Sequence, residues 1–314
     1  MRHVFRGLPA PSEKIDCALA IGNFDGVHRG HQRLLAMVCE AARARGIASA
    51  VMTFEPHPKE FFGASELVRV STLRDKVNAI LACGIERVYI LAFNQDLSSL
   101  KPDDFVQKIL CDGLSCRWVT VGENFRFGAG RAGDFAALKA CAERAGCEAE
   151  AAPLVFFDDD RISSTRIREA MQRGDLEAVR SMTGRPYTIT GHVIHGAELG
   201  RRLDFPTLNI RFAPAGSSAA CALRGSFAVR VRGLAADGRV LGGVASLGVK
   251  PTVTDRRQWL LETNVFDWKG DAYGRIVEVE IVQKLRDERK FSSLEELKAA
   301  IADDARRARE ILGF

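Results

Sequence analysis

The sequence lacks the cysteine spacing that a disulfide framework or a structural zinc site requires. Its 8 cysteines include no C-x-x-C pair, and most of them stand in apolar or helical contexts. Such thiols are typical of reduced, buried side chains in a cytoplasmic protein. No signal peptide precedes residue 18, and no apolar run approaches the ~18 residues that a membrane-spanning helix needs. These absences predict a soluble, cytoplasmic protein without a membrane partner.

A dense basic block is absent as well. The formal net charge is +5, and the Lys and Arg residues are spread along the chain. Dedicated nucleic-acid binding is therefore not indicated, whereas a small polyanion such as a nucleotide fits this charge. The sequence carries no signal for an oligomeric state, which stays open.

The first half of the chain predicts an α/β domain of the Rossmann-like class. The chain has 314 residues, 46% of them hydrophobic, which is enough for two domains with a core each, although one large domain is also possible. Short apolar runs alternate with helical segments over residues 17–173, as in a doubly wound parallel sheet whose functional loops follow the carboxyl ends of the strands. The expected strands are 17–22, 47–54, 87–92, 117–121 and 149–155, and the expected helices are 31–45, 73–83, 103–112 and 134–145.

After about residue 184 the pattern predicts a small antiparallel β-barrel. Six β-rich runs are separated by Gly, Pro and Asp turns, with no long helix among them. A capping box at its start and an apolar face predict a final helix over residues 293–312, packed on the barrel. A helical pattern that ends in Gly184 and Pro186 places the domain boundary near residue 183, giving domains 1–183 and 184–314. The expected barrel strands are 187–195, 205–212, 226–232, 239–246, 258–266 and 275–283.

Two histidines and three glycines stand where the first apolar run becomes a helix, in the segment G-N-F-D-G-V-H-R-G-H over residues 22–31. Glycine lets the backbone approach a ligand closely, and the free N–H groups of a helix start favour an anion. His28 and His31 would share one face of the first turn and donate to phosphate oxygens. A common glycine turn with ordinary histidines is the alternative. No Lys-Ser or Lys-Thr follows the last glycine, so the segment favours nucleotidyl transfer over a P-loop hydrolase.

A second set of donors occurs in the segment I-S-S-T-R-I-R over residues 162–168. Hydroxyls and free N–H groups at a helix start bind phosphate oxygens, and arginines bind them in bidentate fashion. An ordinary helix cap explains the serines and the threonine equally well when the segment is taken alone. Together with the first segment, the phosphate interpretation is the stronger one. The candidate residues are Ser163, Ser164, Thr165, Arg166 and Arg168.

Two loops after predicted strands combine aromatic and polar residues, F-E-P-H-P over 54–58 and G-E-N-F-R-F-G over 122–128. Aromatic rings with an amide and an arginine between them suit a flat, conjugated ligand that carries a phosphate. For Phe54 and Phe127 taken singly, a place in the core is at least as well supported.

The barrel region carries a glycine-rich loop, a Thr-x-Asn pair and one acidic residue inside an apolar strand. Gly196 and Gly200 permit a loop close to phosphates, and Thr207 and Asn209 point to the same side of a strand, where they can hold a hard cation bound to phosphate. A turn and an edge strand explain the same residues cheaply. Glu262 is either an outward-facing strand residue or a placed base, and its spacing supports the two equally.

Taken together and in their order along the chain, these segments resemble the bacterial bifunctional riboflavin kinase/FAD synthetase family over residues 17–312. The resemblance implies an N-terminal adenylyltransferase, in which the phosphate of FMN attacks the α-phosphorus of ATP in line and no covalent intermediate forms. His28, His31, Arg166 and Arg168 would then stabilise the transition state. The resemblance places further residues on the ATP side (Asn23, Asp25 and Gly26) and toward the flavin (Phe54, His57, Asn124 and Arg126).

The same resemblance implies a riboflavin kinase module in the barrel, supported by the segments D-A-Y-G over 271–274 and L-R-x-E over 285–288. Glu262 would accept the proton of the terminal ribityl hydroxyl as it attacks the γ-phosphorus of ATP. Mg²⁺ held by Thr207 and Asn209 would neutralise the phosphates. Riboflavin, FMN, FAD and ATP are the implied substrates and products.

The chain departs from the family pattern at three positions, none of which was assigned a chemical role. Ser246 stands where the family often has Asn, Asn264 where many members have His, and Phe227 where Tyr is usual. Two other hypotheses are a nucleotidyltransferase for another phosphorylated substrate, with the barrel as an accessory part, and a flavin-binding sensor without turnover. The kinase-like segments argue against the first, and the joint presence of Glu262 and the phosphate-site residues argues against the second.

Overall fold

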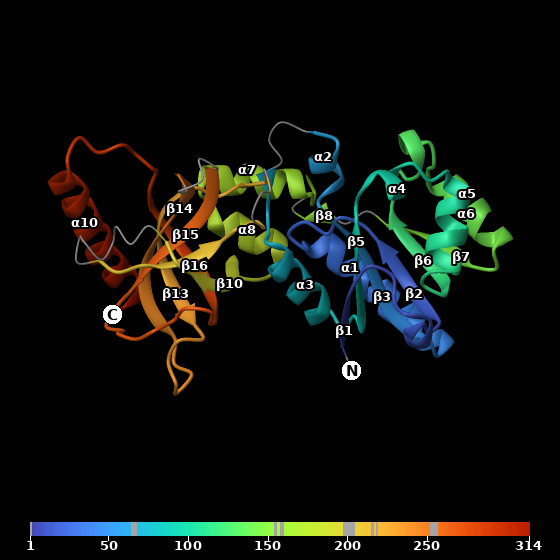
Figure 1. The fold of residues 1–314 in the computed structure, drawn as a ribbon, viewed down its shortest axis with the longest axis horizontal. Coiled ribbons are helices and arrows are strands. Elements are labelled where there is room, and N and C mark those ends of the chain that lie inside the picture. The colour runs from blue at the N-terminus through green and yellow to red at the C-terminus, as the bar shows by residue number, and fades with distance from the viewer. Residues whose placement is uncertain are drawn as a thin grey trace. The chain divides into compact units, whose positions relative to one another are not determined.

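The computed structural model describes residues 2–63, 68–153, 156–157, 160–196, 205–214, 217, 219–251 and 257–314 (Figure 1). The chain divides into two compact units. The first consists of Met1–Ser65 and Lys76–Ser163, and the second of Glu66–Asp75 and Ser164–Phe314. A short segment from the first quarter of the sequence is therefore part of the second unit. None of the described helices is long and apolar enough to cross a membrane.

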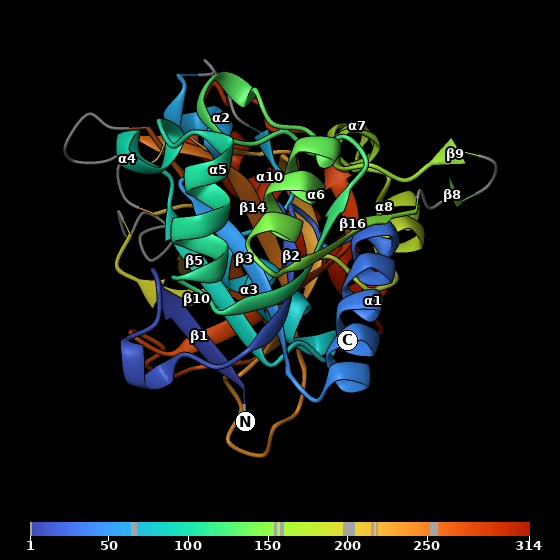
Figure 2. The same ribbon diagram turned by 90° about the vertical axis from the view of Figure 1, so that its right-hand side faces the viewer.

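A six-stranded parallel sheet forms the centre of the first unit, in the order β1-β5-β3-β2-β6-β7. Figure 2 shows β5, β3 and β2 next to one another in this order. The predicted parallel sheet is confirmed, with β1 in addition. The strands are β1 (His3–Arg6), β2 (Cys17–Ile21), β3 (Ala48–Glu55), β5 (Arg87–Ala92), β6 (Cys116–Gly122) and β7 (Glu148–Ala152), and a separate hairpin pairs β8 (Phe156–Phe157) with β9 (Asp160–Arg161).

Helices cover this sheet on both sides. The chain moves in one direction along the sheet from β2 to β3 and in the other from β6 to β7, so right-handed crossovers place α1 and α6 on opposite faces. The predicted helix 103–112 is a short α5 that continues as a π-helical segment, η2. The helical elements are η1 (Pro11–Glu13), α1 (Arg29–Arg45), α2 (Pro58–Phe61), α3 (Leu73–Ala82, which begins in the segment of the second unit), α4 (Gln95–Ser98), α5 (Pro102–Asp104), η2 (Phe105–Cys111), η3 (Ala129–Arg131) and α6 (Phe135–Arg144).

The carboxyl ends of β3, β2 and β6 lie side by side at one edge of the sheet, because these strands are neighbours and run parallel. The order of strands reverses at β2, and ligands of open α/β sheets bind at such a point. The segment between β2 and α1, residues 22–28, is called the phosphate loop below. It leaves the sheet at this switch point.

The second unit is a closed antiparallel barrel in the order β10-β11-β15-β14-β13-β16. The predicted barrel and the predicted final helix are both confirmed. Helix α10 packs against β13, β14 and β16 (Figure 1), and it begins where the Ser293 hydroxyl accepts a hydrogen bond from the backbone N–H of Glu296. The strands are β10 (Thr188–Ile194), β11 (Leu208–Arg211), β13 (Gly225–Arg232), β14 (Leu241–Pro251), β15 (Arg257–Val265) and β16 (Ile276–Arg286), and the helix is α10 (Leu294–Leu312).

Further elements complete the second unit. Strand β4 (Val68–Arg69) pairs in parallel with β12 (Ala220–Cys221). Helices α7 (Ser164–Arg173) and α8 (Leu176–Thr183) also belong to this unit, and α8 packs on β16. The domain boundary near residue 183 stays a prediction, since these helices precede it.

Candidate active sites

The phosphate loop ends in a pair of stacked histidines at the start of α1. His28 is the N-cap residue, and its Nδ1 accepts a hydrogen bond from the backbone N–H of His31 at 3.2 Å. The two rings lie 3.7 Å apart at an angle of 17°. Because Nδ1 of His28 is an acceptor, the neutral ring carries its proton on Nε2, which is then a donor. Gly30 lies inside the helix, so the predicted helix start at residue 31 was two residues late.

The phosphate loop has a strained backbone. Phe24 has a φ of +50° and Val27 a φ of +39°. Of the three glycines in residues 22–31, only Gly26 has a positive φ, of +84°. Non-glycine residues in this region cost ~1–3 kcal/mol each and persist where surrounding contacts hold them. One such contact joins the Gln32 side-chain N–H to the Val27 carbonyl at 2.9 Å. Strain of this kind is typical of a functional loop.

Side chains of the phosphate loop divide between the interior and the surface. Phe24 is 1% exposed, and its ring lies 5.2 Å from that of His31. Asp25 is buried as well, whereas Asn23 is exposed. The loop therefore presents Asn23 outward, whereas the N-cap residue His28 is buried, and the loop rests on a buried aromatic ring.

A cluster of four phenylalanines lies where β3 and β5 end. Phe54 is buried in the core, and Phe93 makes edge contacts with Phe54, Phe61 and Phe62 at centroid distances of 5.6, 5.6 and 5.7 Å. Phe62 is 68% exposed, which is unusual for so large an apolar ring. Phe61, Phe62 and Phe93 were not predicted as site residues, although the adjacent pair at 61–62 is a signal visible in the sequence.

His57, predicted to face the flavin, caps the short helix α2. Its Nδ1 accepts a hydrogen bond from the Lys59 backbone N–H at 3.1 Å, and the backbone N–H of His57 donates to the Glu60 carboxylate at 3.1 Å. This capping box positions the turn that carries Phe61. The geometry gives His57 a structural task, and its contact with a ligand stays a prediction.

The loop after β6 presents the predicted Asn124 and Arg126 on the surface. The Arg126 guanidinium donates to the Phe125 carbonyl at 3.1 Å. Phe127 is buried against Gly133, where an added Cβ would lie 2.5 Å from the nearest atom of the Phe127 ring. Phe127 therefore belongs to the core, as the alternative interpretation held, and it anchors the loop that carries the two polar residues.

The hydroxyl-rich segment opens α7 in the second unit. Ser163, the last residue of the first unit, precedes the helix, and Ser164, Thr165 and Arg166 form its first turn. The Arg168 guanidinium donates through Nε to the Val68 carbonyl at 2.6 Å. Joint use of this helix start and the phosphate loop stays a prediction.

Three polar residues lie in one row across three neighbouring strands of the barrel. Glu262 on β15 is directly opposite Asn209 on β11 and Ser246 on β14. Directly opposite residues of paired strands project from the same face of a sheet. We call Asn209, Ser246 and Glu262 the barrel site.

Asn209 carries a buried oxygen that suits a cation. Asn209 is 5% exposed, and its Oδ1 has no hydrogen-bond partner among the described residues. A buried carbonyl oxygen without a hydrogen-bond donor costs free energy of folding. Such an oxygen is a suitable ligand for a hard cation. Thr207 lies half-buried just before β11. The donor set therefore fits Mg²⁺ on a phosphate better than it fits zinc, and among the described residues no group of three or more His, Cys, Asp or Glu could hold a metal.

Gly196 is in close contact with the Asn209 amide. A Cβ added to Gly196 would lie 2.7 Å from Cγ and 2.8 Å from Oδ1 of Asn209. Gly196 was predicted to form part of a loop near phosphates. Its observed contact is with Asn209, the predicted cation ligand. Gly200 lies outside the described residues.

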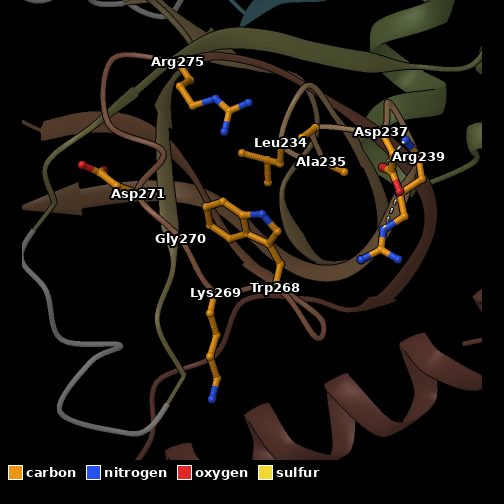
Figure 3. A pocket seen from close by; sticks show the side chains of 10 residues that line it. Leu234, Ala235, Asp237, Arg239, Trp268, Lys269, Gly270, Asp271 and Arg275 are labelled. Atoms are coloured by element: carbon orange, nitrogen blue, oxygen red, sulfur yellow. Dashed lines mark hydrogen bonds and ion pairs between the residues drawn. The ribbon is translucent and has the colours of Figure 1, made fainter.

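A shallow pocket with a volume of about 480 Å³, open to solvent, lies at the same end of the barrel as Thr207 and Gly196. The antiparallel strand order places the turn from β13 to β14 and the segment from β15 to β16 at this end. Figure 3 shows Arg275 and Trp268 facing one space, beside the ion pair of Arg239 with Asp237. Only Asp271 of its lining belongs to a segment that the sequence singled out. The pocket is lined by Leu234, Ala235, Ala236, Asp237, Arg239, Trp268, Lys269, Gly270, Asp271 and Arg275.

Comparison with known proteins divides the chain into two regions. Residues 10–166 match the family described as FAD synthetase, and residues 183–312 match the family described as riboflavin kinase. A crystal structure from Streptococcus pneumoniae, described as a macrolide-efflux protein, covers 98% of both chains with a TM-score of 0.72 and 25% identity. The two proteins share their fold over the whole chain.

Several curated relatives are named bifunctional riboflavin kinase/FMN adenylyltransferase. The protein of Escherichia coli K12 is 40% identical over 306 residues, which are 97% of this chain and 95% of that one. The Pseudomonas fluorescens protein is 41% identical over 94% of this chain and 93% of its own. The Bacillus subtilis protein is 34% identical over 94% and 92%. The chain therefore belongs to the family of bifunctional riboflavin kinase/FMN adenylyltransferases.

Proposed function

We propose that this chain makes FMN from riboflavin at the barrel site and FAD from FMN at the phosphate loop, with ATP as the second substrate of both reactions. The bifunctional kinase and adenylyltransferase activity follows from the family. The residue assignment rests on one observation above all, the position of Glu262 directly opposite Asn209, whose buried oxygen has no hydrogen-bond donor in the described part of the chain. The matches over 10–166 and 183–312 support our placing of the domains at 1–183 and 184–314.

At the barrel site, Glu262 takes the proton of the terminal ribityl hydroxyl as that oxygen attacks the γ-phosphorus of ATP, whose bond to the bridging oxygen breaks so that ADP leaves. A carboxylate within reach of the hydroxyl acts as a general base, an effect of ~10²–10⁴-fold. Asn209 and Thr207 would hold Mg²⁺, which supplies charge neutralisation to the phosphates when bound. Gly196 keeps the Asn209 amide in place, because any side chain at residue 196 would displace it.

At the phosphate loop, adenylyl transfer depends on alignment and on hydrogen-bond donors. The phosphate of FMN attacks the α-phosphorus of ATP, and pyrophosphate leaves. The donors are the His28 Nε2–H, the His31 ring and the first N–H groups of α1, all of which are preorganised by the loop. We extend the donor set to Ser163, Ser164, Thr165, Arg166 and Arg168, and we place Asn23, Asp25 and Gly26 on the ATP side.

We place the flavin ring near the four phenylalanines at the ends of β3 and β5. An exposed Phe62 beside Phe93 offers an aromatic face to a flat conjugated ring. Asn124 and Arg126 would bind the polar edge and the phosphate of FMN. His57 would hold the turn that carries Phe61.

A single incubation with riboflavin, ATP and Mg²⁺, with FMN and FAD resolved chromatographically over time, tests the whole assignment. Glu262→Gln is expected to stop the formation of FMN and to leave the conversion of supplied FMN to FAD intact. The double variant His28→Ala/His31→Ala is expected to do the reverse. Loss of both activities from either folded variant would contradict the assignment to two separate sites.

A further inference from the structure

Lys76 is a buried cation close to the phosphate loop that the adenylyl transfer described above does not use. It lies on α3 and is 7% exposed. Its Nζ donates to the hydroxyl of Thr53 at 3.2 Å, and that hydroxyl donates to the backbone carbonyl of Asn23 at 3.2 Å. Thr53 is fully buried near the end of β3. Two hydrogen bonds thus join the ammonium group to the first part of the phosphate loop.

The direction of this relay is fixed by the chemistry of its members. An ammonium group donates and cannot accept, so the Thr53 oxygen must accept from Lys76. The single hydroxyl proton of Thr53 is then left for the Asn23 carbonyl. A hydrogen bond from a charged donor in a buried setting is stronger than one between neutral groups, and it polarises the next bond in the chain. Lys76 therefore strengthens the hold of Thr53 on Asn23.

The held carbonyl lies where the strain of the loop begins. Asn23 directly precedes Phe24, whose φ is +50°, and the far side of the strain, at Val27, is held by the Gln32 side chain. A strained loop keeps its shape only while both ends are fixed. We propose that Lys76 is a positioning residue for adenylyl transfer, which acts through Thr53 to fix the Asn23 end of the phosphate loop. This inference rests on the proposed use of that loop.

Lys76→Met tests the relay, because it removes the charge and the donor and keeps an apolar chain of similar length in a buried place. Misplacement of a reacting group by a fraction of an ångström reduces turnover strongly. We expect kcat for FMN adenylylation to fall ~10- to 100-fold, with a much smaller change in KM for FMN. Riboflavin phosphorylation by the same polypeptide is expected to stay at the wild-type rate.

Thr53 supplies variants that test the relay without removing the charge. Thr53→Val should reproduce the loss in kcat, and Thr53→Ser, which keeps the hydroxyl, should restore it. The double variant Lys76→Met/Thr53→Val should lose no more than either single variant, since both break one chain of bonds. Thr120→Val is the matched control, because Thr120 is also fully buried in the sheet and its hydroxyl makes no hydrogen bond with any described residue.

The outcomes separate this inference from the function on which it rests. A wild-type protein that makes no FAD from FMN contradicts the assignment of the loop. If the wild-type protein makes FAD, and both Thr53→Val and Lys76→Met have the wild-type kcat, the positioning role alone is overturned. If Lys76→Met loses its native near-UV dichroism, Thr53→Val against Thr53→Ser decides the matter. A fall in Thr120→Val equal to that in Thr53→Val also overturns the proposal.

Discussion

In our proposal, the phosphate loop and the barrel site bind phosphate groups by different means. The loop would use the backbone N–H groups at the start of α1 and the stacked rings of His28 and His31, and strain at Phe24 and Val27 shapes it. The barrel site uses side chains on rigid strands, and strand register alone brings Asn209 opposite Glu262. The first design is local in sequence and costs backbone strain. The second is unstrained and depends on residues that lie more than fifty positions apart.

Asn209→Ala is expected to give the largest effect and would break the barrel side of this comparison. It removes the buried oxygen assigned to the cation, so riboflavin phosphorylation should fall ~10²–10³-fold, as for loss of one preorganised group at a reacting centre. Conversion of supplied FMN to FAD should not change. Initial rates of both reactions are the measurement.

Thr263→Val is the matched control for Asn209→Ala. Thr263 lies on β15 beside Glu262 and is fully buried, and its hydroxyl has no hydrogen-bond partner within the ranges that the structure describes. Its replacement should leave phosphorylation near the wild-type rate. Wild-type phosphorylation by Asn209→Ala would mean that the cation is held elsewhere.

Gly196→Ala should reduce riboflavin phosphorylation ~10- to 100-fold, because it displaces the Asn209 amide without removing it. The new Cβ would lie 2.8 Å from Oδ1 of Asn209, so the amide must move. Added to Asn209→Ala, the same substitution should have almost no further effect, because the group that it displaces is already gone. Additive losses in the double variant would show that Gly196 acts through a different contact.

Gln32→Met tests the local design of the phosphate loop and should have a smaller effect. It removes the hydrogen bond to the Val27 carbonyl, worth ~1 kcal/mol, so adenylylation should fall ~5- to 10-fold while phosphorylation is unchanged. Gln107→Met is the control, because it breaks a hydrogen bond with Asp112 that lies on the surface of the same unit. An unchanged rate of adenylylation in Gln32→Met would show that the strained loop holds its shape without this contact.

The same contrast explains what the sequence could predict. The glycine and histidine pattern of residues 22–31 is contiguous, so the phosphate loop, the parallel sheet and the barrel could be recognised from local patterns. The pairing of Asn209 with Glu262 could not, since register is set by the closed barrel. Strand β1 was missed because a four-residue edge strand with alternating exposure has no continuous apolar run. The placement of residues 68–75 in the second unit has no local signal at all.

A buried carboxylate, that of Asp75, joins the segment 68–75 to the barrel. The Asp75 carboxylate accepts hydrogen bonds from the Thr72 hydroxyl at 2.6 Å and from the Thr190 backbone N–H of β10 at 3.1 Å. Burial raises the pKa of Asp75 above its ordinary value of 3.8, against the opposing effect of these bonds. A raised carboxyl pKa means that the folded state holds its proton more tightly than the unfolded state does. Stability is therefore lost as pH rises from 3.8 through the folded pKa of Asp75, and the loss is complete above that pKa.

Asp75→Asn keeps an acceptor oxygen and removes the buried charge. Its thermal midpoint should exceed that of the wild type at pH 7, and the difference should vanish as pH falls toward 4, in melts followed by tryptophan fluorescence. Asp287→Asn is the control of opposite sign, because Lys284 lowers the pKa of that exposed carboxyl. It should be slightly less stable than the wild type at pH 7. A lower midpoint of Asp75→Asn throughout this range would mean that the charge itself holds the segment on the barrel, and that long-range assembly of the second unit includes an ionic contact.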